Sequence, residues 1–170
     1  MSAQTRAVLT HLYDALARRD GAAMAALYAP DASFEDPVFR LRGPQIGAMW
    51  IELTRRAKDF GISYTITQSD SGRGTVECTA RYRFGTHPVV NRILSEIEIE
   101  DGRIVRQRDR FDFPRWAVQA LGPAGTPLRP LFLVPESRVS PREAPTRSVS
   151  AGRAHIIHAL RPSPFQRRSK

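Results

Sequence analysis

Apolar residues in the first third of the chain recur at the three- and four-residue spacing of an α-helix. Leu9, Leu12 and Leu16 mark one such stripe, and Ile46 and Trp50 belong to another that follows a proline suited to a first helical turn. The elements predicted here are helices over 4–19 and 22–29, extended segments over 32–36 and 38–41, and a long helix that opens at Gly43-Pro44 and runs to about residue 57.

From residue 61 the apolar residues alternate with polar ones, which is the period of a half-buried β-strand. This alternation predicts strands around 62–66, 76–84, 93–99 and 103–113, and a short helix follows over 114–121. Helices at the N-terminal end and a run of strands after them predict an α+β fold, in which a curved antiparallel sheet forms a cone around the helices. Such a sheet, partly closed by helices, leaves a cavity of the kind that binds small molecules.

The turn at Asp101-Gly102 allows the register of the last hairpin to be argued. A two-residue loop would set Glu98 opposite Val105, whereas a three-residue loop with Gly102 in a bulge sets Glu98 opposite Arg106. The second arrangement is favoured because it pairs opposite charges on the outer face. Its predicted inner face consists of Ser95, Ile97, Ile99, Val105, Gln107, Asp109 and Phe111.

Composition changes after Gly122. Eight of the 13 prolines lie beyond it, and residues 123–170 hold nine basic residues against two acidic ones, whereas residues 1–122 hold 17 against 15. We therefore expect a folded domain over 1–122 and a disordered tail over 123–170 that carries most of the net charge of +9. Basic charge suggests nucleic acid or another acidic surface, but no recognition motif accompanies it, so nucleic-acid binding is not expected.

The cysteine and histidine residues point away from disulfide and metal chemistry. Cys78 is the chain's one cysteine, which fits a reducing cytoplasm, and its place in an alternating strand predicts a buried, unreactive thiol. His11 and His87 lack neighbours that would complete a metal site, and no glycine-rich phosphate loop precedes a helix, so we expect no metal and no cofactor. No apolar run approaches the roughly 20 residues of a membrane span, and the N-terminus lacks the apolar core of a signal peptide.

Asp36 is the leading candidate for chemistry because it stands among apolar neighbours in Phe34-Glu35-Asp36-Pro37-Val38. A strand alternates its faces, so Asp36 is expected to follow Phe34 into the interior. A carboxyl held against apolar walls has a raised pKa and can exchange protons with a bound molecule. The alternative is an aspartate that caps local backbone amides in a turn before Pro37.

This motif and the order of elements resemble the nuclear transport factor two-like superfamily, which includes ketosteroid isomerases, limonene epoxide hydrolases and SnoaL-type polyketide cyclases. The resemblance covers residues 4–122, about seven-tenths of the chain. In ketosteroid isomerases the aspartate of a nearly identical stretch, here Asp36, shuttles a proton on the steroid. Tyr13 falls where those enzymes keep the tyrosine of their oxyanion hole, although such a tyrosine is more commonly part of a core.

The chain departs from the catalytic patterns of both enzyme groups. The isomerases carry a second, protonated aspartate in the strand before the last hairpin, where this chain has Ser95. The stretch from Arg108 to Asp112 instead resembles the epoxide hydrolases, in which the first aspartate, here Asp109, activates water. Their Arg-x-Asp pair is incomplete, because Arg83 follows Arg81 at the position of the aspartate. Asp109 is thus a second acid/base candidate or, alternatively, the partner of a neighbouring arginine.

The pattern as a whole is most similar to the SnoaL-like branch of the superfamily. This resemblance implies a cofactor-independent isomerase, cyclase or hydrolase that acts on a small apolar, steroid-, polyketide- or terpenoid-like molecule, with Asp36, Tyr13 and Asp109 as catalytic residues. The residues expected to line the cavity are Tyr28, Met49, Trp50, Phe60, Tyr82, Phe84, Asn91, Ser95, Phe111 and Trp116. The alternative is a non-catalytic module of the same fold that binds a ligand or dimerises. A homodimer is expected in either case, because sheet-face dimers are frequent in the superfamily.

Overall fold

The structure of the protein is a computed structural model that describes residues 2–122. Its elements are α1 (Ala3–Ala17), α2 (Gly21–Ala26), β1 (Tyr28–Glu35), β2 (Arg40–Arg42), α3 (Pro44–Arg56), β3 (Lys58–Asp70), β4 (Arg73–Phe84), β5 (His87–Glu100), β6 (Arg103–Arg110) and α4 (Phe113–Leu121). Their order confirms the predicted α+β class. The predicted tail, residues 123–170, lies outside the described part of the chain.

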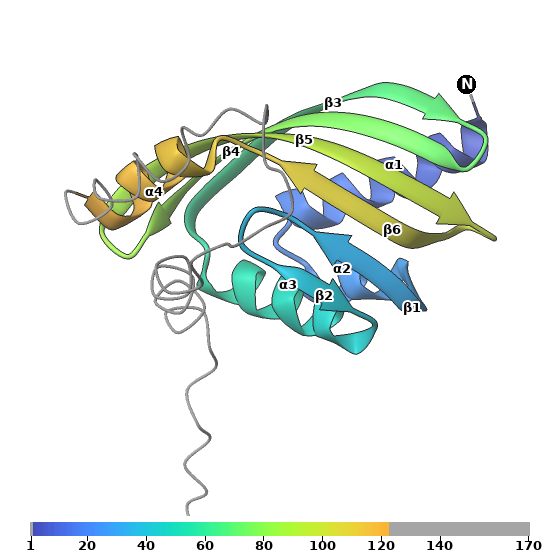
Figure 1. Cartoon of the computed structure of the whole chain (residues 1–170), viewed down its shortest axis with the longest axis horizontal. Coiled ribbons are helices and arrows are strands. Elements are labelled where there is room, and N and C mark those ends of the chain that lie inside the picture. The colour runs from blue at the N-terminus through green and yellow to red at the C-terminus, as the bar shows by residue number, and fades with distance from the viewer. Residues whose placement is uncertain (1, 123–170) are drawn as a thin grey trace, which may run out of the picture. The chain divides into compact units, whose positions relative to one another are not determined.

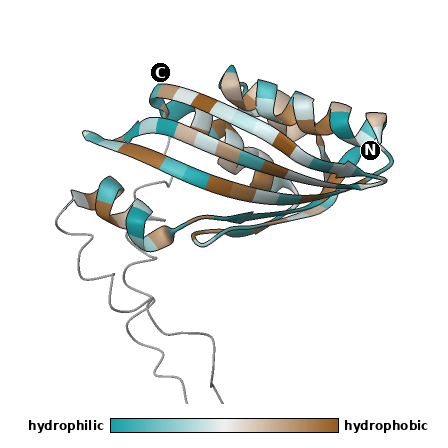
Figure 2. Ribbon diagram, turned by 90° about the horizontal axis from the view of Figure 1, so that it is seen from above, coloured by the Kyte–Doolittle hydropathy of each residue, from teal (hydrophilic) through white to brown (hydrophobic). Residues whose placement is uncertain are grey.

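The strands form one curved, open sheet in the order β2-β1-β6-β5-β4-β3 (Figure 1). Strands β3 to β6 follow one another as antiparallel hairpins, as predicted. Strand β1 instead lies parallel to β6, so the expectation of a wholly antiparallel sheet was wrong at this pair. Hydrophobic and hydrophilic residues alternate along the long strands (Figure 2). This alternation gives the sheet one largely apolar face, on which helices can pack.

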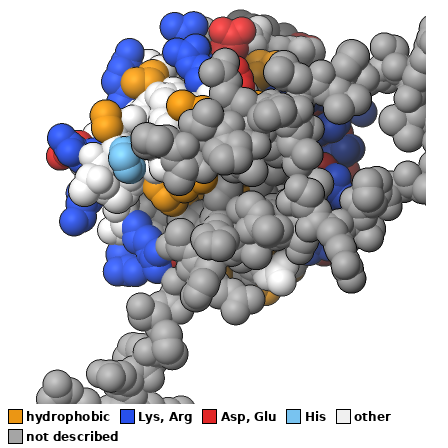
Figure 3. All heavy atoms as spheres, turned by 60° about the vertical axis from the view of Figure 1, so that its left-hand side comes forward, with side chains coloured by type: hydrophobic (Ala, Val, Ile, Leu, Met, Phe, Trp, Pro, Cys, Tyr) orange, Lys and Arg blue, Asp and Glu red, His pale blue; other side chains and the backbone are white. Residues whose placement is uncertain are grey.

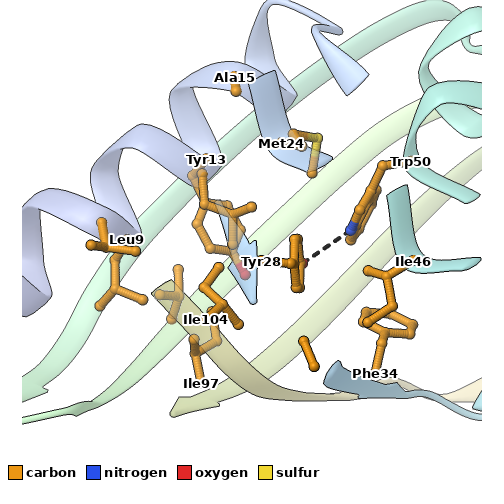
Figure 4. Packing of buried hydrophobic residues seen from close by; sticks show 14 of the residues in the cluster. Leu9, Tyr13, Ala15, Met24, Tyr28, Phe34, Ile46, Trp50, Ile97 and Ile104 are labelled. Carbon is orange, nitrogen blue, oxygen red and sulfur yellow. Dashed lines mark hydrogen bonds between the residues drawn. The ribbon is translucent and has the colours of Figure 1, made fainter. Parts of the chain in front are cut away.

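Helices α1, α2 and α3 cover the inner face of the sheet and enclose the hydrophobic core, part of which is drawn in Figure 4. The contact between α1 and β4 is close because Gly74 has no side chain. A Cβ at this position would lie only 2.4 Å from Cδ1 of Leu9, which has no exposed surface. The glycine thus permits α1 to approach the sheet.

Side-chain oxygens fix the starts of three helices. Ser2, Asp20 and Asp112 each accept a hydrogen bond from the backbone N–H three residues further on, at α1, α2 and α4 respectively. Helix α4 is also held to the edge of its neighbouring strand, because Oε1 of Gln119 accepts the backbone N–H of Val90 in β5 at 2.8 Å. This anchoring sets the position of the aromatic residues that α4 carries.

The pairing of β5 with β6 confirms the predicted ladder, with Glu98 opposite Arg106. The predicted three-residue loop was wrong, because Asp101 and Gly102 form a two-residue turn with positive φ at both positions, 48° and 75°. The register is restored by an extra residue, Val105, inserted where the ladder shifts. As a result Ile104, which is fully buried, takes the core position that the sequence assigned to Val105.

Two boundaries near β1 also differ from prediction. The helix expected to run to residue 29 ends at Ala26, and Tyr28 begins β1. The backbone N–H of Ile104 donates to the carbonyl of Leu27 at 2.9 Å, so pairing with a distant strand outweighs the local preference for helix. At its other end β1 stops at Glu35, so Asp36 lies in a turn and not in the strand that was predicted over 32–36.

Candidate active site

Asp109 lies on the inner face of the sheet, directly opposite Ser95 in the neighbouring strand β5, as the predicted register required. Its Oδ1 accepts a hydrogen bond from Nε2 of Gln107 at 2.9 Å, and Ser95 also hydrogen-bonds its carboxyl. The alternative prediction, that Asp109 pairs with a neighbouring arginine, was wrong. The adjacent Arg110 instead pairs with Glu96 on the outer face, at 2.9 Å.

The carboxyl of Asp109 is poised to exchange a proton near neutral pH. Its pKa is raised to about 6, first by burial and also by the negative charge of Asp36, while the bonds from Gln107 and Ser95 oppose the rise. The residue keeps partial exposure, although its carboxyl is surrounded by protein atoms. A group with this pKa is available as both acid and base under ordinary conditions.

A first chain of hydrogen bonds reaches Asp109 from helix α1. The hydroxyl of Tyr13 donates to Oγ of Ser95 at 2.7 Å, and Ser95 in turn bonds the carboxyl. Burial, together with the charge of Asp109, raises the pKa of Tyr13 well above its usual range, so the hydroxyl keeps its proton and acts as a donor. In this structure the Tyr13 hydroxyl donates its hydrogen bond to Ser95. Its predicted role as a donor to a substrate oxygen stays a prediction.

A second chain reaches Asp109 from β1 and α3, and Figure 4 shows its outer members. Nε1–H of Trp50 donates to the Tyr28 hydroxyl at 3.0 Å, and that hydroxyl donates to Oε1 of Gln107 at 2.5 Å. The amide of Gln107 then donates to Asp109. Because the donors of both chains point toward one carboxyl, the chains favour its ionised form.

Asp36 is held by its own backbone, as the alternative prediction described. Its Oδ1 accepts the N–H groups of Val38 at 2.7 Å and Phe39 at 2.5 Å. The strand ends before Asp36, so the prediction that it belongs to the strand was wrong; Asp36 is half-buried while Phe34 is only 3% exposed, and a catalytic role for Asp36 stays a prediction. Its charge nevertheless acts on the site, because it raises the pKa of Asp109.

Aromatic residues gather around Trp116 of α4. Its ring lies 5.7 Å from that of Phe84 in an edge contact, 5.7 Å from Phe113 in a stack and 6.3 Å from Phe111. Its Nε1–H donates to the hydroxyl oxygen of Tyr82 at 2.7 Å. In Figure 3, which brings the α4 end of Figure 1 forward, hydrophobic side chains are visible between lysine and arginine side chains. We call Tyr82, Phe84, Phe111, Phe113 and Trp116 the aromatic cluster.

The other predicted lining residues lie in different parts of the molecule. Met49 and Trp50 of α3 and Tyr28 of β1 are buried in the core, whereas Asn91 is buried on the inner face of β5, near the aromatic cluster. Phe60 on β3 is half-buried, with its ring 6.5 Å from that of Tyr82. For each of these residues a contact with substrate stays a prediction.

Gln107 was not among the predicted site residues, yet it connects Tyr28 to Asp109. The available signal was the hairpin register, which placed it on the inner face two residues before the candidate acid. Within residues 2–122, no three His, Cys, Asp or Glu side chains come together in a way that could hold a metal ion. None of the described helices is long and apolar enough to cross a membrane.

Comparison with known families agrees with this architecture. Residues 9–107 match the SnoaL-like domain, and the chain therefore belongs to the SnoaL-like family. A curated relative, the steroid Delta-isomerase of Nocardioides simplex, is 55% identical over 38 residues. That match spans 22% of this chain and 31% of the isomerase, so it covers less than a third of the relative's length.

Solved structures share the fold at low sequence identity. An LEH-like epoxide hydrolase from M. tuberculosis superposes with a TM-score of 0.59 at 22% identity, over 76% of this chain and 98% of that one. A putative polyketide cyclase from Silicibacter sp. superposes with a TM-score of 0.61 at 17% identity, over 68% of this chain and 94% of that one. A protein of ketosteroid isomerase-like fold from Catenulispora acidiphila, in complex with trimethylamine, superposes with a TM-score of 0.60 at 17% identity. The superposition covers 71% of this chain and 96% of that one.

Proposed function

We propose that the protein is a cofactor-independent enzyme that binds a small, largely apolar molecule and uses the Asp109 carboxyl to move a proton or to activate water. Isomerase, cyclase and hydrolase reactions all fall within this chemistry. The observation that carries the proposal is a carboxyl with a pKa raised to about 6 at the end of two converging hydrogen-bond chains. A group so placed is suited to general acid/base catalysis.

The structure supports a division of roles that differs from the one expected from sequence. Asp109 takes the part of the acid/base, and Asp36 contributes a negative charge that keeps Asp109 from being too weak a base. Tyr13 acts through Ser95, and Tyr28 acts through Gln107, so both are positioning residues. Ser95 stands where the isomerases carry their second aspartate, and its cross-strand neighbour Asp109 brings a carboxyl to the adjoining space.

Two probe reactions test the proposal. Isomerisation of a β,γ-unsaturated ketosteroid is followed by the absorbance of the conjugated product, and hydrolysis of limonene epoxide is followed by gas chromatography. With whichever probe is turned over, Asp109→Asn is expected to lower the rate by about 10²–10⁴-fold. Asp36→Asn is expected to have a smaller effect, because the loss of its charge shifts the pKa of Asp109 but leaves that carboxyl in place. Glu98→Gln, on the outer face, is the matched control and is expected to leave the rate unchanged.

Full activity in Asp109→Asn would show that this carboxyl is not the acid/base. If the wild-type protein binds both probes but returns them unchanged after long incubation, the non-catalytic binding module is the better description. The two outcomes are separate, because binding is measured directly by calorimetry and turnover by product.

A further inference from the structure

We propose that Tyr82 and Asn91 form a second polar subsite, which hydrogen-bonds a neutral oxygen, a carbonyl or a hydroxyl, at the end of the ligand remote from Asp109. The inference rests on the proposed function, because the same ligand is taken to reach Asp109. It assigns the ligand a general form, an apolar body with oxygen functions at both ends.

The side-chain amide of Asn91 has no hydrogen-bond partner among residues 2–122, although the backbone of this buried residue pairs with β4. Asn91 is only 7% exposed and lies on the inner face of β5, in line with Val89 and Ser95. Its cross-strand neighbour on β4 is Ala80, which has a small side chain. The side-chain nitrogen and oxygen of Asn91 are not among the fully buried, unpaired polar atoms of residues 2–122, so they reach the surface from an inward position, where a ligand can bond them.

Tyr82 has a hydroxyl proton available for a ligand. Its oxygen accepts the Nε1–H of Trp116 at 2.7 Å, and across the described residues the hydroxyl donates to no side chain. The other inward tyrosines differ in this respect, because Tyr13 donates to Ser95 and Tyr28 donates to Gln107. Trp116 is fixed by its ring contacts in the aromatic cluster, so the orientation of the Tyr82 hydroxyl is fixed as well.

The two side chains are placed to act together. Tyr82 is opposite Val89 and Asn91 is opposite Ala80, so Tyr82 and Asn91 are diagonal neighbours on one face, roughly 7–8 Å apart. One supplies a hydroxyl donor, and the other supplies an amide that both donates and accepts. Aromatic rings next to Tyr82, those of Phe60 and Trp116, give the subsite apolar walls.

Charge favours a neutral ligand group over an anion. The pKa of Tyr82 is raised by burial and also by the negative charge of Asp36, while the bond from Trp116 opposes the rise. The hydroxyl therefore stays protonated and faces a negative potential. A carboxylate or phosphate at this position would be repelled, whereas a carbonyl or hydroxyl would accept its hydrogen bond without that cost.

The register sets the length of the ligand. Asn91 lies four residues before Ser95 on β5, which corresponds to roughly 13 Å along the strand, and Ser95 is directly opposite Asp109. Allowing for the reach of the side chains, two oxygens on the order of 10 Å apart would meet both ends. Biphenyl-4,4′-diol is a rigid probe of this form, and 4-hydroxybiphenyl is the same molecule without the second oxygen.

Calorimetric titration of the full chain with the two compounds tests the subsite. We expect the diol to bind the wild-type protein about five- to tenfold more tightly than 4-hydroxybiphenyl, of which about twofold comes from its two equivalent ends. Tyr82→Phe and Asn91→Leu should each bring the ratio of dissociation constants down toward two. Tyr64→Phe, which removes a hydroxyl bonded to Asp14, is the matched control and should keep the wild-type ratio.

The proposal is wrong if the advantage of the diol persists in both variants, or if neither compound binds the wild-type protein. Thermal melting checks that each variant folds, and Asn91→Leu decides the matter alone if Tyr82→Phe does not fold. Failure here is distinct from failure of the proposed function, because the ratio of affinities does not depend on turnover, and the Asp109→Asn rate measurement does not depend on Tyr82.

Discussion

Replacing Gln107 by methionine is expected to raise the pKa of Asp109 by about one to two units. Methionine keeps the volume of the side chain but removes the N–H that bonds Oδ1 at 2.9 Å. Gln107 is 2% exposed, so water does not readily take the place of the amide. A hydrogen bond to a charged group contributes about 1.5–3 kcal/mol, and one pKa unit corresponds to about 1.4 kcal/mol. The sign is upward because the amide stabilises the ionised form.

The assay is a ¹³C NMR titration of the side-chain carboxyls, with Asp109→Asn used to assign the signal of Asp109. Gln45→Met is the control, because this exposed glutamine bonds the backbone of Arg42 at the start of α3, away from the site. An unchanged or lowered midpoint for Asp109 in Gln107→Met would refute the reasoning. It would mean that the chain through Tyr28 does not stabilise the charged carboxyl.

Three further perturbations test other parts of the account. The pKa of Asp109 is raised from 3.8 to about 6, which means that folding favours the protonated form of this carboxyl. This stabilisation is present at low pH and is lost as pH rises from about 4 to 6. Urea unfolding should therefore show the wild-type protein losing stability relative to Asp109→Asn over that range, and a constant difference between the two proteins would contradict the prediction. Gly74→Ala is expected to lower the free energy of unfolding by about 1–3 kcal/mol, because it forces a Cβ against Leu9. Gly61→Ala is the control and should cause no such loss, because no atom lies within 4 Å of the added Cβ. Equal losses in the two variants would contradict the packing argument. Tyr28→Phe should lower the free energy of unfolding by about 1–3 kcal/mol, because it leaves the buried groups of Gln107 and Trp50 without their partner; a neutral result would show that water replaces the hydroxyl.

Local pattern was enough to predict much of the sheet and the direction of Asp109. The Glu98–Arg106 pair sets the hairpin register through adjacent residues, so the inner face of β6 followed from the sequence even though the loop was described wrongly. Asp36 shows the limit of the same reasoning. Alternation holds only within a strand, and the hydrogen bonds from Val38 and Phe39 end the strand before it reaches Asp36.

The second hydrogen-bond chain could not be predicted because it depends on contacts between distant segments. Tyr28 has an apolar helical neighbourhood in sequence, and the parallel pairing of β1 with β6 sets Tyr28 opposite Ile104, from where its hydroxyl reaches Gln107. That pairing has no local signal comparable to a hairpin turn. The resemblance to the superfamily did not predict the β1–β6 pairing either, because the motifs on which the resemblance rests lie in other segments.

The central claim is that Asp109 is a carboxyl poised near neutral pH inside the sheet, and its titration in the wild-type protein tests this most directly. The ¹³C signal of its side-chain carboxyl is expected to titrate with a midpoint of about 6. A midpoint near 4, the ordinary value for an exposed aspartate, would contradict the claim.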